Sequence, residues 1–215
     1  MTGPPASGRR WLVVVVAAVA AALLLLAGGA LAVLTGIGRA SFPSEGSVDA
    51  GFARDMSTHH RQAVTMAGLV RDRSVDPDIE PLAFDIESTQ NNQVGMMQGW
   101  LRAWDLPVNT TATQMAWMSG QEAMDMTSGL MPGMATPEEL DELRALSGPE
   151  LDVRFLQLMI RHHMGGVPMA EYAVEHAETE VVRRLAQTIV DTQSAEVLSM
   201  EQLLRDRGGS VLPRP

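Results

Sequence analysis

The sequence predicts an all-α protein, a four-helix bundle made of two duplicated helical hairpins and preceded by a hydrophobic N-terminal helix. Three observations predict this architecture. An uncharged apolar run of membrane-spanning length lies near the N-terminus, two later segments repeat each other without a gap, and apolar residues in each copy recur at helical spacing. The 215 residues suffice for one packed domain plus an appendage.

The composition excludes several kinds of protein. There is no cysteine, which excludes disulfides, thiolate metal sites, thiol catalysis and a lipid-modified cysteine anchor. The formal net charge is -10 and lysine is absent, so the clustered positive charge that nucleic acid binding needs is missing. Methionine, by contrast, occurs 15 times. We therefore expect no nucleic acid partner, and we look for functional residues among the histidines and methionines.

Residues 11–34 form an apolar run, WLVVVVAAVAAALLLLAGGALAVL, that matches the ~20 residues needed to cross a bilayer. A pair of arginines precedes it, so the positive-inside rule places residues 1–10 in the cytoplasm and everything after a linker at 35–48 outside. The alternative is a cleaved signal peptide with a small-residue cleavage site at 30–32, although the run exceeds the ~7 to 15 residues of a usual signal core. The sequence predicts a single-pass membrane protein with an extracytoplasmic domain, or a secreted domain after cleavage.

Residues 52–104 and 155–207 are two copies of one segment. They align without a gap at an offset of 103 residues, and 16 of the 53 aligned positions are identical. The identities include two adjacent histidines, then a valine and a Met-Ala pair. The repeat predicts two similar hairpins within a bundle domain at 49–209, with a Met-rich connection at 105–149 between them and a tail at 210–215.

Each copy carries a stripe of apolar positions on its first helix. Phe52, Met56, His59, Ala63 and Met66 advance by four and three residues, the heptad spacing that keeps side chains on one helix face. The partner helices repeat this rhythm, so we expect four helices to face a common core. The other predicted stripe positions are Phe155, Met159, His162, Gly166 and Met169, then Leu82, Ile86, Thr89, Gln93, Met97 and Trp100, and finally Leu185, Ile189, Thr192, Glu196, Met200 and Leu203.

Turn and capping signals mark the expected helix ends. Asp76-Pro77 breaks the first hairpin with turn chemistry and a helix-initiating proline, and the second hairpin breaks near residues 177–180. In the connection we expect one short helix at 115–126 and a second that begins at a capping box. Boxes of this spacing occur at Thr136 with Glu139 and at Ser147 with Glu150. A connection of this length lets the second hairpin lie in either direction beside the first.

A pseudo-twofold packing of the two hairpins would bring four histidines together at the centre of the bundle. His59, His60, His162 and His163 would then meet among thioethers from the same helices. Neutral imidazole binds copper, zinc, iron and nickel, whereas thioether sulfur is soft and selects Cu(I). The sequence therefore predicts a copper site, with Cu(I) favoured and Cu(II) or another divalent metal open. Its candidate methionine ligands on these helices are Met56, Met66, Met159 and Met169.

Two further groups of residues are candidates for this site. The turn MPGM at 131–134 can present two thioethers, Met131 and Met134, from a loop that no hydrophobic core requires. Gln93 and Glu196 occupy matching inward positions, where each could orient an imidazole by a hydrogen bond. We expect the first group to add metal ligands and the second to hold the histidines.

The same residues also permit a structural interpretation. Methionine is a flexible core filler and a buried histidine is usually a hydrogen-bonded core residue, which would make the domain a non-metal structural or protein-interaction module outside the membrane. A di-iron site is not expected because its Glu-x-x-His pairs are missing, and no nucleophile motif or phosphate loop indicates an enzyme. We expect metal binding without catalysis, with a copper- or iron-dependent oxidoreductase as a minor alternative.

The stretches DMSTHHRQAVTMA, MPGMATPEEL and FLQLMIRHHMGGVPMAEYAVEHA resemble an exported family catalogued as domain of unknown function number 305, over residues 48–209. The resemblance implies a ferritin-like four-helix bundle and, because some members bind copper, a copper buffer, chaperone or resistance factor. One departure is Pro168, which is expected to kink the second signature helix. The residues that match the family's signature are His59, His60, Met66, His162, His163 and Met169, with Met131 and Met134 in its central Met-rich loop.

Overall fold

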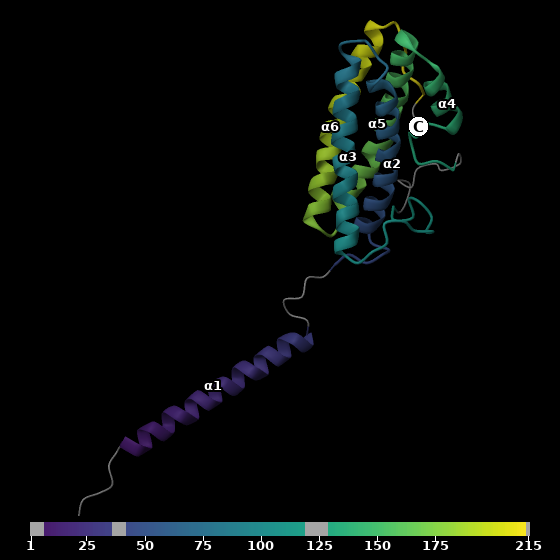
Figure 1. Ribbon diagram of the computed structural model, residues 1–215. Helices are drawn as coiled ribbons and strands as arrows, with labels where there is room; N and C mark the ends of the chain where they lie inside the picture. The colour runs from purple at the N-terminus through teal and green to yellow at the C-terminus, as the bar shows by residue number, and fades with distance from the viewer. Residues whose placement is uncertain (1–6, 36–41, 119–128, 214–215) are drawn as a thin grey trace, which may run out of the picture. The chain divides into compact units, whose positions relative to one another are not determined.

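The computed structural model describes residues 7–35, 42–118 and 129–213, which contain six helices and no strand (Figure 1). The all-α prediction is therefore confirmed. The chain divides into two compact units, Met1–Phe42 and Pro43–Pro215. The helices are α1 (Ser7–Thr35), α2 (Val48–Arg71), α3 (Ile79–Ala103), α4 (Pro137–Ala145), α5 (Gly148–His176) and α6 (Glu180–Asp206).

The first unit consists of the apolar helix α1. Its segment Arg10–Thr35 has a mean hydropathy of 2.8 and buries none of its side chains within the protein. Length and composition make it the one helix, among the described residues, that could cross a membrane, and a signal sequence near the N-terminus would share these properties. The helix fits either a membrane anchor or a signal segment.

The second unit is a four-helix bundle in which α2 packs on α3 and α5, and α5 packs on α6 (Figure 1). Asp49 at the start of α2 accepts hydrogen bonds from Thr179 at the start of α6, so these two helices begin at the same end. Arg207 after α6 pairs with Asp76 before α3 at the opposite end. Helices α2 and α6 therefore run one way and α3 and α5 the other, which decides the hairpin direction that the sequence left open.

Local signals explain some helix starts. Thr136 and Glu139 form the predicted capping box at α4. Ser147 precedes α5 but makes no side-chain cap hydrogen bond, so the second predicted box is wrong; Gly148 follows it with a φ of 58°, outside helical geometry. Pro77 lies in the turn before α3 rather than in its first turn.

The connection between the hairpins is less helical than predicted. Residues 115–118 form turns, and Met115 has a φ of 63°, which a helix does not permit, so the expected helix does not begin there. The rest of that predicted helix, up to residue 126, lies outside the described residues. Helix α4 is the short helix that the connection contains in its described part.

The heptad stripes are confirmed on α2 and α5 but shifted on their partners. All five stripe residues of α2 are fully buried. On α3 and α6, however, Thr89 is exposed and Thr192 is only partly buried, whereas Gln90 and Gln193 are buried. The buried positions of both helices still advance by four and three residues, so the predicted stripe was one residue out of phase at each threonine. On α3 these positions are Ala83, Ile86, Gln90, Gln93 and Met97.

A polar layer divides the core of the bundle into two apolar clusters. One cluster contains Met56 and Met169, and the other contains Met66 and Met159. Because α2 and α5 run in opposite directions, residues that precede the histidines on α2 share a cluster with residues that follow the histidines on α5. The four predicted methionine ligands are thus distributed as one pair on each side of the histidines.

Candidate metal centre

The four predicted histidines form the polar layer of the bundle core. Each has an exposed fraction of 0%. The imidazole centroids of His59 and His162 lie 3.8 Å apart, and those of His59 and His60, and of His162 and His163, lie 6.5 and 6.2 Å apart. The structure therefore brings the two repeated pairs together, and it buries His60 and His163 as completely as their neighbours.

Backbone carbonyls hold one nitrogen of each central imidazole. Nε2 of His162 lies 3.0 Å from the carbonyl oxygen of His59, and Nε2 of His59 lies 3.0 Å from the carbonyl oxygen of Pro132. A carbonyl oxygen only accepts, so both Nε2 atoms must carry hydrogen and donate it. In the neutral ring this leaves the lone pair on Nδ1.

Side chains hold the outer pair of imidazoles in the same way. Nε2 of His60 lies 2.7 Å from Oε1 of Gln93, and Nε2 of His163 lies 2.6 Å from Oε2 of Glu196. The carboxylate only accepts, so it fixes hydrogen on Nε2 of His163, and the amide oxygen does the same for His60. Gln93 and Glu196 thus make the imidazole hydrogen bonds that their matching sequence positions predict.

The opposite nitrogen of every ring is without a partner. Nδ1 of all four histidines is buried and makes no hydrogen bond, and both amide heteroatoms of Gln90 and of Gln193 are also buried and unpaired. These are eight polar atoms, four imidazole nitrogens and two amide atoms on each of two glutamines. A buried unpaired polar atom costs roughly 1–3 kcal/mol, whereas a whole domain is stable by about 5–15 kcal/mol. The layer therefore contains buried donors and acceptors that a bound group could satisfy.

Burial keeps the imidazoles of His59, His60 and His162 neutral. It lowers the pKa of His59 to about 4, against the Pro132 carbonyl, which favours the charged form. Burial and then the neighbouring His59 lower the pKa of His60 to about 3. The pKa of His162 is also lowered well below its ordinary value, first by burial and then by the surrounding histidines. At neutral pH these three imidazoles are therefore unprotonated, and each keeps a nitrogen lone pair that is free for a ligand.

Gln90 and Gln193 belong to the layer, although the sequence analysis did not select them. A side chain added at Gly166 would meet Oε1 of Gln193 at 2.8 Å and Cε1 of His59 at 3.1 Å, so Gly166 leaves the space where these two groups approach. The two glutamines occupy matching positions in the repeat and are identical. That identity was the available signal, but heptad counting pointed to the threonines beside them.

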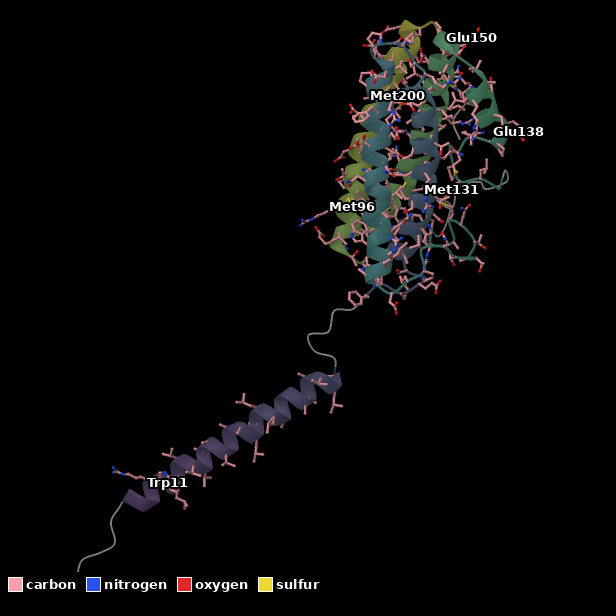
Figure 2. All side chains as sticks on the ribbon, viewed as in Figure 1. Trp11, Met96, Met131, Glu138, Glu150 and Met200 are labelled. Carbon is pink, nitrogen blue, oxygen red and sulfur yellow. The ribbon has the colours of Figure 1, made fainter. Side chains whose placement is uncertain are left out.

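The turn at 131–134 docks on the bundle instead of presenting ligands to solvent. Met131 is 1% exposed and shares a cluster with Met56 and Met169, and Met134 packs partly buried against that cluster. Figure 2 shows Met131 beside α2, on the side of the bundle that faces the connection. The prediction that no hydrophobic core requires this turn is wrong, because the turn closes one side of the core.

Close backbone packing fixes the position of this turn. A Cβ at Gly165 would lie 2.1 Å from the Pro132 carbonyl oxygen, so only glycine permits the contact between α5 and the turn. Gln62 on α2 donates its amide to the Ala135 carbonyl at 2.9 Å and accepts from the Ala135 amide. These contacts hold the Pro132 carbonyl against Nε2 of His59.

The arrangement limits the kind of metal that it could hold. In the described part of the chain, no three His, Asp or Glu side chains are placed to ligate one ion. The close His59 and His162 pair, with a methionine pair on either side, offers two imidazoles and thioethers, which suit a soft ion such as Cu(I) or Ag(I).

Pro168 does not interrupt the second half of the site. Helix α5 continues across it from Gly148 to His176. The histidine pairs of the two copies also make matching side-chain hydrogen bonds, His60 to Gln93 and His163 to Glu196. The second half therefore keeps the hydrogen bonds of the first.

Solved proteins share this fold. A DUF305 protein from Streptomyces coelicolor is 46% identical, with a TM-score of 0.72, and the match covers 80% of this chain and 100% of that one. A DUF305 fragment from Deinococcus radiodurans is 30% identical, with a TM-score of 0.64, over 77% of this chain and 99% of that one. No curated protein matches the chain.

Two further structures are of CopM with copper bound. The Cu(I)-bound form is 26% identical, with a TM-score of 0.57, over 74% of this chain and 96% of that one. The Cu(II)-bound form is 27% identical, with the same TM-score, over 74% of this chain and 97% of that one. The sequence profile of the family described as "Domain of unknown function (DUF305)" matches residues 49–204. The chain therefore belongs to the DUF305 family.

Proposed function

We propose that the bundle binds a soft metal ion, Cu(I) foremost, in its histidine layer and serves outside the cytoplasm as a copper buffer, chaperone or resistance factor. The observation that carries the proposal is the set of four buried Nδ1 atoms without hydrogen-bond partners. Each ring is turned by a hydrogen bond at Nε2, an arrangement that commonly fixes the tautomer of a metal-binding histidine. Copper-bound CopM structures, which share the fold, support the choice of metal.

The residues would have different roles in holding the ion. His59 and His162 are the central imidazoles, and the predicted soft donors are the sulfurs of Met56 and Met169 in one adjoining cluster, or of Met66 and Met159 in the other. Met131 shares the first cluster, whereas Met134 lies at its edge. A soft ion would supply an acceptor for lone pairs. His60 and His163 are the other two histidines of the layer. Nothing in this donor set assigns a substrate or a catalytic step, so we propose a carrier rather than an enzyme.

The N-terminal helix supports an extracytoplasmic location for this site. Helix α1 fits an anchor or a signal segment, and either would carry the bundle out of the cytoplasm. Methionine and histidine are suitable ligands there, because a cysteine site would be open to disulfide formation in an oxidising compartment. The absence of cysteine from the chain agrees with such a location.

Titration of Cu(I) and Ag(I) into the full-length protein in detergent tests the proposal. The double variant His59→Gln with His162→Gln should lose more than about 100-fold in affinity, because even the hydrogen-bond partners of metal ligands are worth about 10–100-fold. The variant His176→Gln, at an exposed histidine outside the layer, is the matched control and should bind as the unaltered protein does. Far-ultraviolet circular dichroism checks that each variant is helical.

A second measurement keeps the test decisive if the double variant unfolds. The Nδ1 resonances of the unaltered protein should shift on addition of Ag(I), while the Nε2 resonances keep their hydrogens. An ion held at a hundredfold excess over its Kd should also stabilise the fold by about 2.7 kcal/mol. Unshifted Nδ1 resonances and an unchanged melting temperature would instead favour the structural module.

A further inference from the structure

The histidine layer is closed to solvent on all sides, so an ion must pass through the wall of the bundle. All four imidazoles are fully buried, and an apolar cluster covers the layer toward each end of the bundle. Of the four walls, those between α2 and α3, α5 and α6, and α2 and α5 are formed by helices in extensive contact. Helices α3 and α6 are not in such contact, which makes their boundary the loosest wall.

A groove of about 770 Å³ lies along this boundary. Its lining comes from both helices and includes Thr89, Gln93 and Met96 of α3 and Thr188 of α6. Arg184 is the charged residue in the lining, and it pairs with Glu180 at 2.7 Å, which offsets its repulsion of a cation. The groove is therefore an open, nearly neutral depression over the polar layer.

One side chain links this groove to the histidines. Gln93 lines the groove, is 7% exposed, and lies with its Oε1 2.7 Å from Nε2 of His60. Gln90 and Gln193, one on each wall helix, are 3% exposed and have unpaired amide groups inside the wall. A cation that enters at Gln93 would thus meet amide oxygens before it meets imidazole nitrogens.

A soft donor stands at the mouth of the same groove. Met96 lines it and is 42% exposed, which is unusual for a methionine in a bundle with so many buried ones. Figure 2 shows Met96 on the opposite side of the bundle from Met131. The repeat counterparts of Met96 and Trp100 are Ser199 and Leu203, so the equivalent surface of the second copy offers no thioether.

We propose that this groove is the access route by which a soft monovalent metal ion reaches the histidine layer, with the Met96 thioether at its mouth and the Gln93 amide at its floor. The inference rests on the proposed function, because it assumes that the layer binds such an ion. Thioether sulfur captures the soft ion, and amide oxygens then replace part of its water before the imidazoles take it. Gln93 swings aside to open the way and returns to hold His60.

Stopped-flow loading with Ag(I) in chloride-free buffer tests the route on the full-length protein in detergent, with tryptophan fluorescence as the readout. The variant Thr89→Phe fills the groove from an exposed position and should slow both loading and release by about tenfold, a change of about 1.4 kcal/mol in the barrier. The Kd should stay unchanged, because a blocked route alters the barrier and not the end states. Met96→Leu keeps the side-chain volume but removes the sulfur, and should slow loading and release by the same factor, because it also leaves the end states unchanged.

The matched control is Thr192→Phe, at the repeat counterpart of Thr89 and outside the groove lining. It should load at the rate of the unaltered protein. Equal loading rates for Thr89→Phe and the unaltered protein would overturn the route but leave the proposed function standing. Slow loading in Thr192→Phe would do the same, because it would indicate that the ion enters on the Glu196 side. An unaltered protein that takes up no Ag(I) at Nδ1 would remove the proposed function and the route with it.

Discussion

At the scale of single residues, each histidine of the layer has one committed nitrogen and one unused nitrogen. Nε2 donates to a carbonyl, an amide oxygen or a carboxylate, and Nδ1 is buried without a partner. The hydrogen bonds fix the orientation of the four rings, while burial lowers the pKa of His59, His60 and His162 and keeps these three rings neutral. Such residues differ from ordinary core histidines, in which both nitrogens are normally satisfied.

The lowered pKa values predict a metal-free protein that is stable near neutral pH and loses stability in mild acid. In the unfolded chain the histidines take up protons below about pH 6.5, whereas in the folded bundle His59 and His60 do so only near pH 4 and 3. Between these values the unfolded state binds more protons, so each histidine lowers the free energy of unfolding by about 1.4 kcal/mol per pH unit as the pH falls. Urea unfolding at pH 7, 6 and 5 measures the decline.

A variant shows whether the histidines cause this decline. His60→Gln removes one titrating group and should give a shallower loss between pH 7 and pH 5 than the unaltered protein. Equal unfolding free energies at the two pH values in the unaltered protein would contradict the proposed neutral, buried state.

Substitution of two helical glycines, Gly165 and Gly95, gives a second prediction at this scale, which concerns the stability of the bundle. A methyl group at Gly165 would collide with the Pro132 carbonyl and the Gly133 amide, so Gly165→Ala should destabilise the bundle by about 1–3 kcal/mol and displace the carbonyl from His59. Gly95 is also helical but has nothing within 4 Å of its added methyl group, so Gly95→Ala should stabilise by about 0.5–1 kcal/mol. Thermal or urea unfolding of the two variants compares them, and effects of the same sign would refute the packing argument.

At the scale of secondary-structure elements, contacts between helix ends set the geometry of the bundle. Asp49 on α2 accepts from the Glu178 and Thr179 amides at 2.7 and 2.9 Å and from the Thr179 hydroxyl. It therefore caps α6 from another helix, since Thr179 makes no cap bond with its own side chain. At the far end, Arg207 pairs with Asp76. These two links hold α6 in register with the first hairpin.

The cap contributed by Asp49 gives a prediction with a matched control at the same 103-residue offset, just before the second copy. Asp49→Ala leaves two amides and a hydroxyl unpaired at the start of α6 and should cost about 2 kcal/mol. Asp152 occupies the equivalent position before the second copy, but its Oδ1 is buried without a partner, so Asp152→Ala should cost less. Urea unfolding ranks the two variants. A larger loss at Asp152 would show that the cap does not stabilise α6.

At the scale of the whole molecule, the chain combines a membrane-length helix with a bundle whose core is interrupted by polar groups. The two apolar clusters supply the hydrophobic stabilisation, and the histidine layer between them opposes it as long as its lone pairs are unpaired. A bound ion would therefore join the two halves of the core as well as occupy a site. Metal loading and fold stability are expected to rise together in this protein.

The N-terminal helix gives a prediction about the full-length protein in cells. If α1 remains as an anchor, the chain should keep its full mass of 23.2 kDa and stay with membranes after an alkaline wash, because the 26-residue segment Arg10–Thr35 is long and apolar enough to span a bilayer core. Mass spectrometry of the mature protein measures this directly. A product that begins near residue 33 and washes off the membrane would identify the segment as a cleaved signal instead.

Several features of the site could be predicted from the sequence because they depend on local periodicity. The spacing of Phe52, Met56 and His59 determined that the histidine would face inward, and the 103-residue repeat determined that a second histidine pair would match the first. The same repeat paired Gln93 with Glu196 as partners of the imidazoles. The apolar N-terminal run and the capping box at α4 were equally local, since each depends on residues within a few turns of one helix.

Only the tertiary structure decided the features that depend on distant contacts. The direction of the second hairpin, the burial of Met131 and the contact between the Pro132 carbonyl and His59 all join segments more than thirty residues apart, and no short-range pattern encodes such contacts. The burial of Gln90 and Gln193 in place of their threonine neighbours was also decided by packing, because both phases of the four-and-three count fit the sequence and the contacts between helices select one of them. The sequence by itself thus determined which side chains face the core, whereas the packing of four helices decided which nitrogens they leave unpaired.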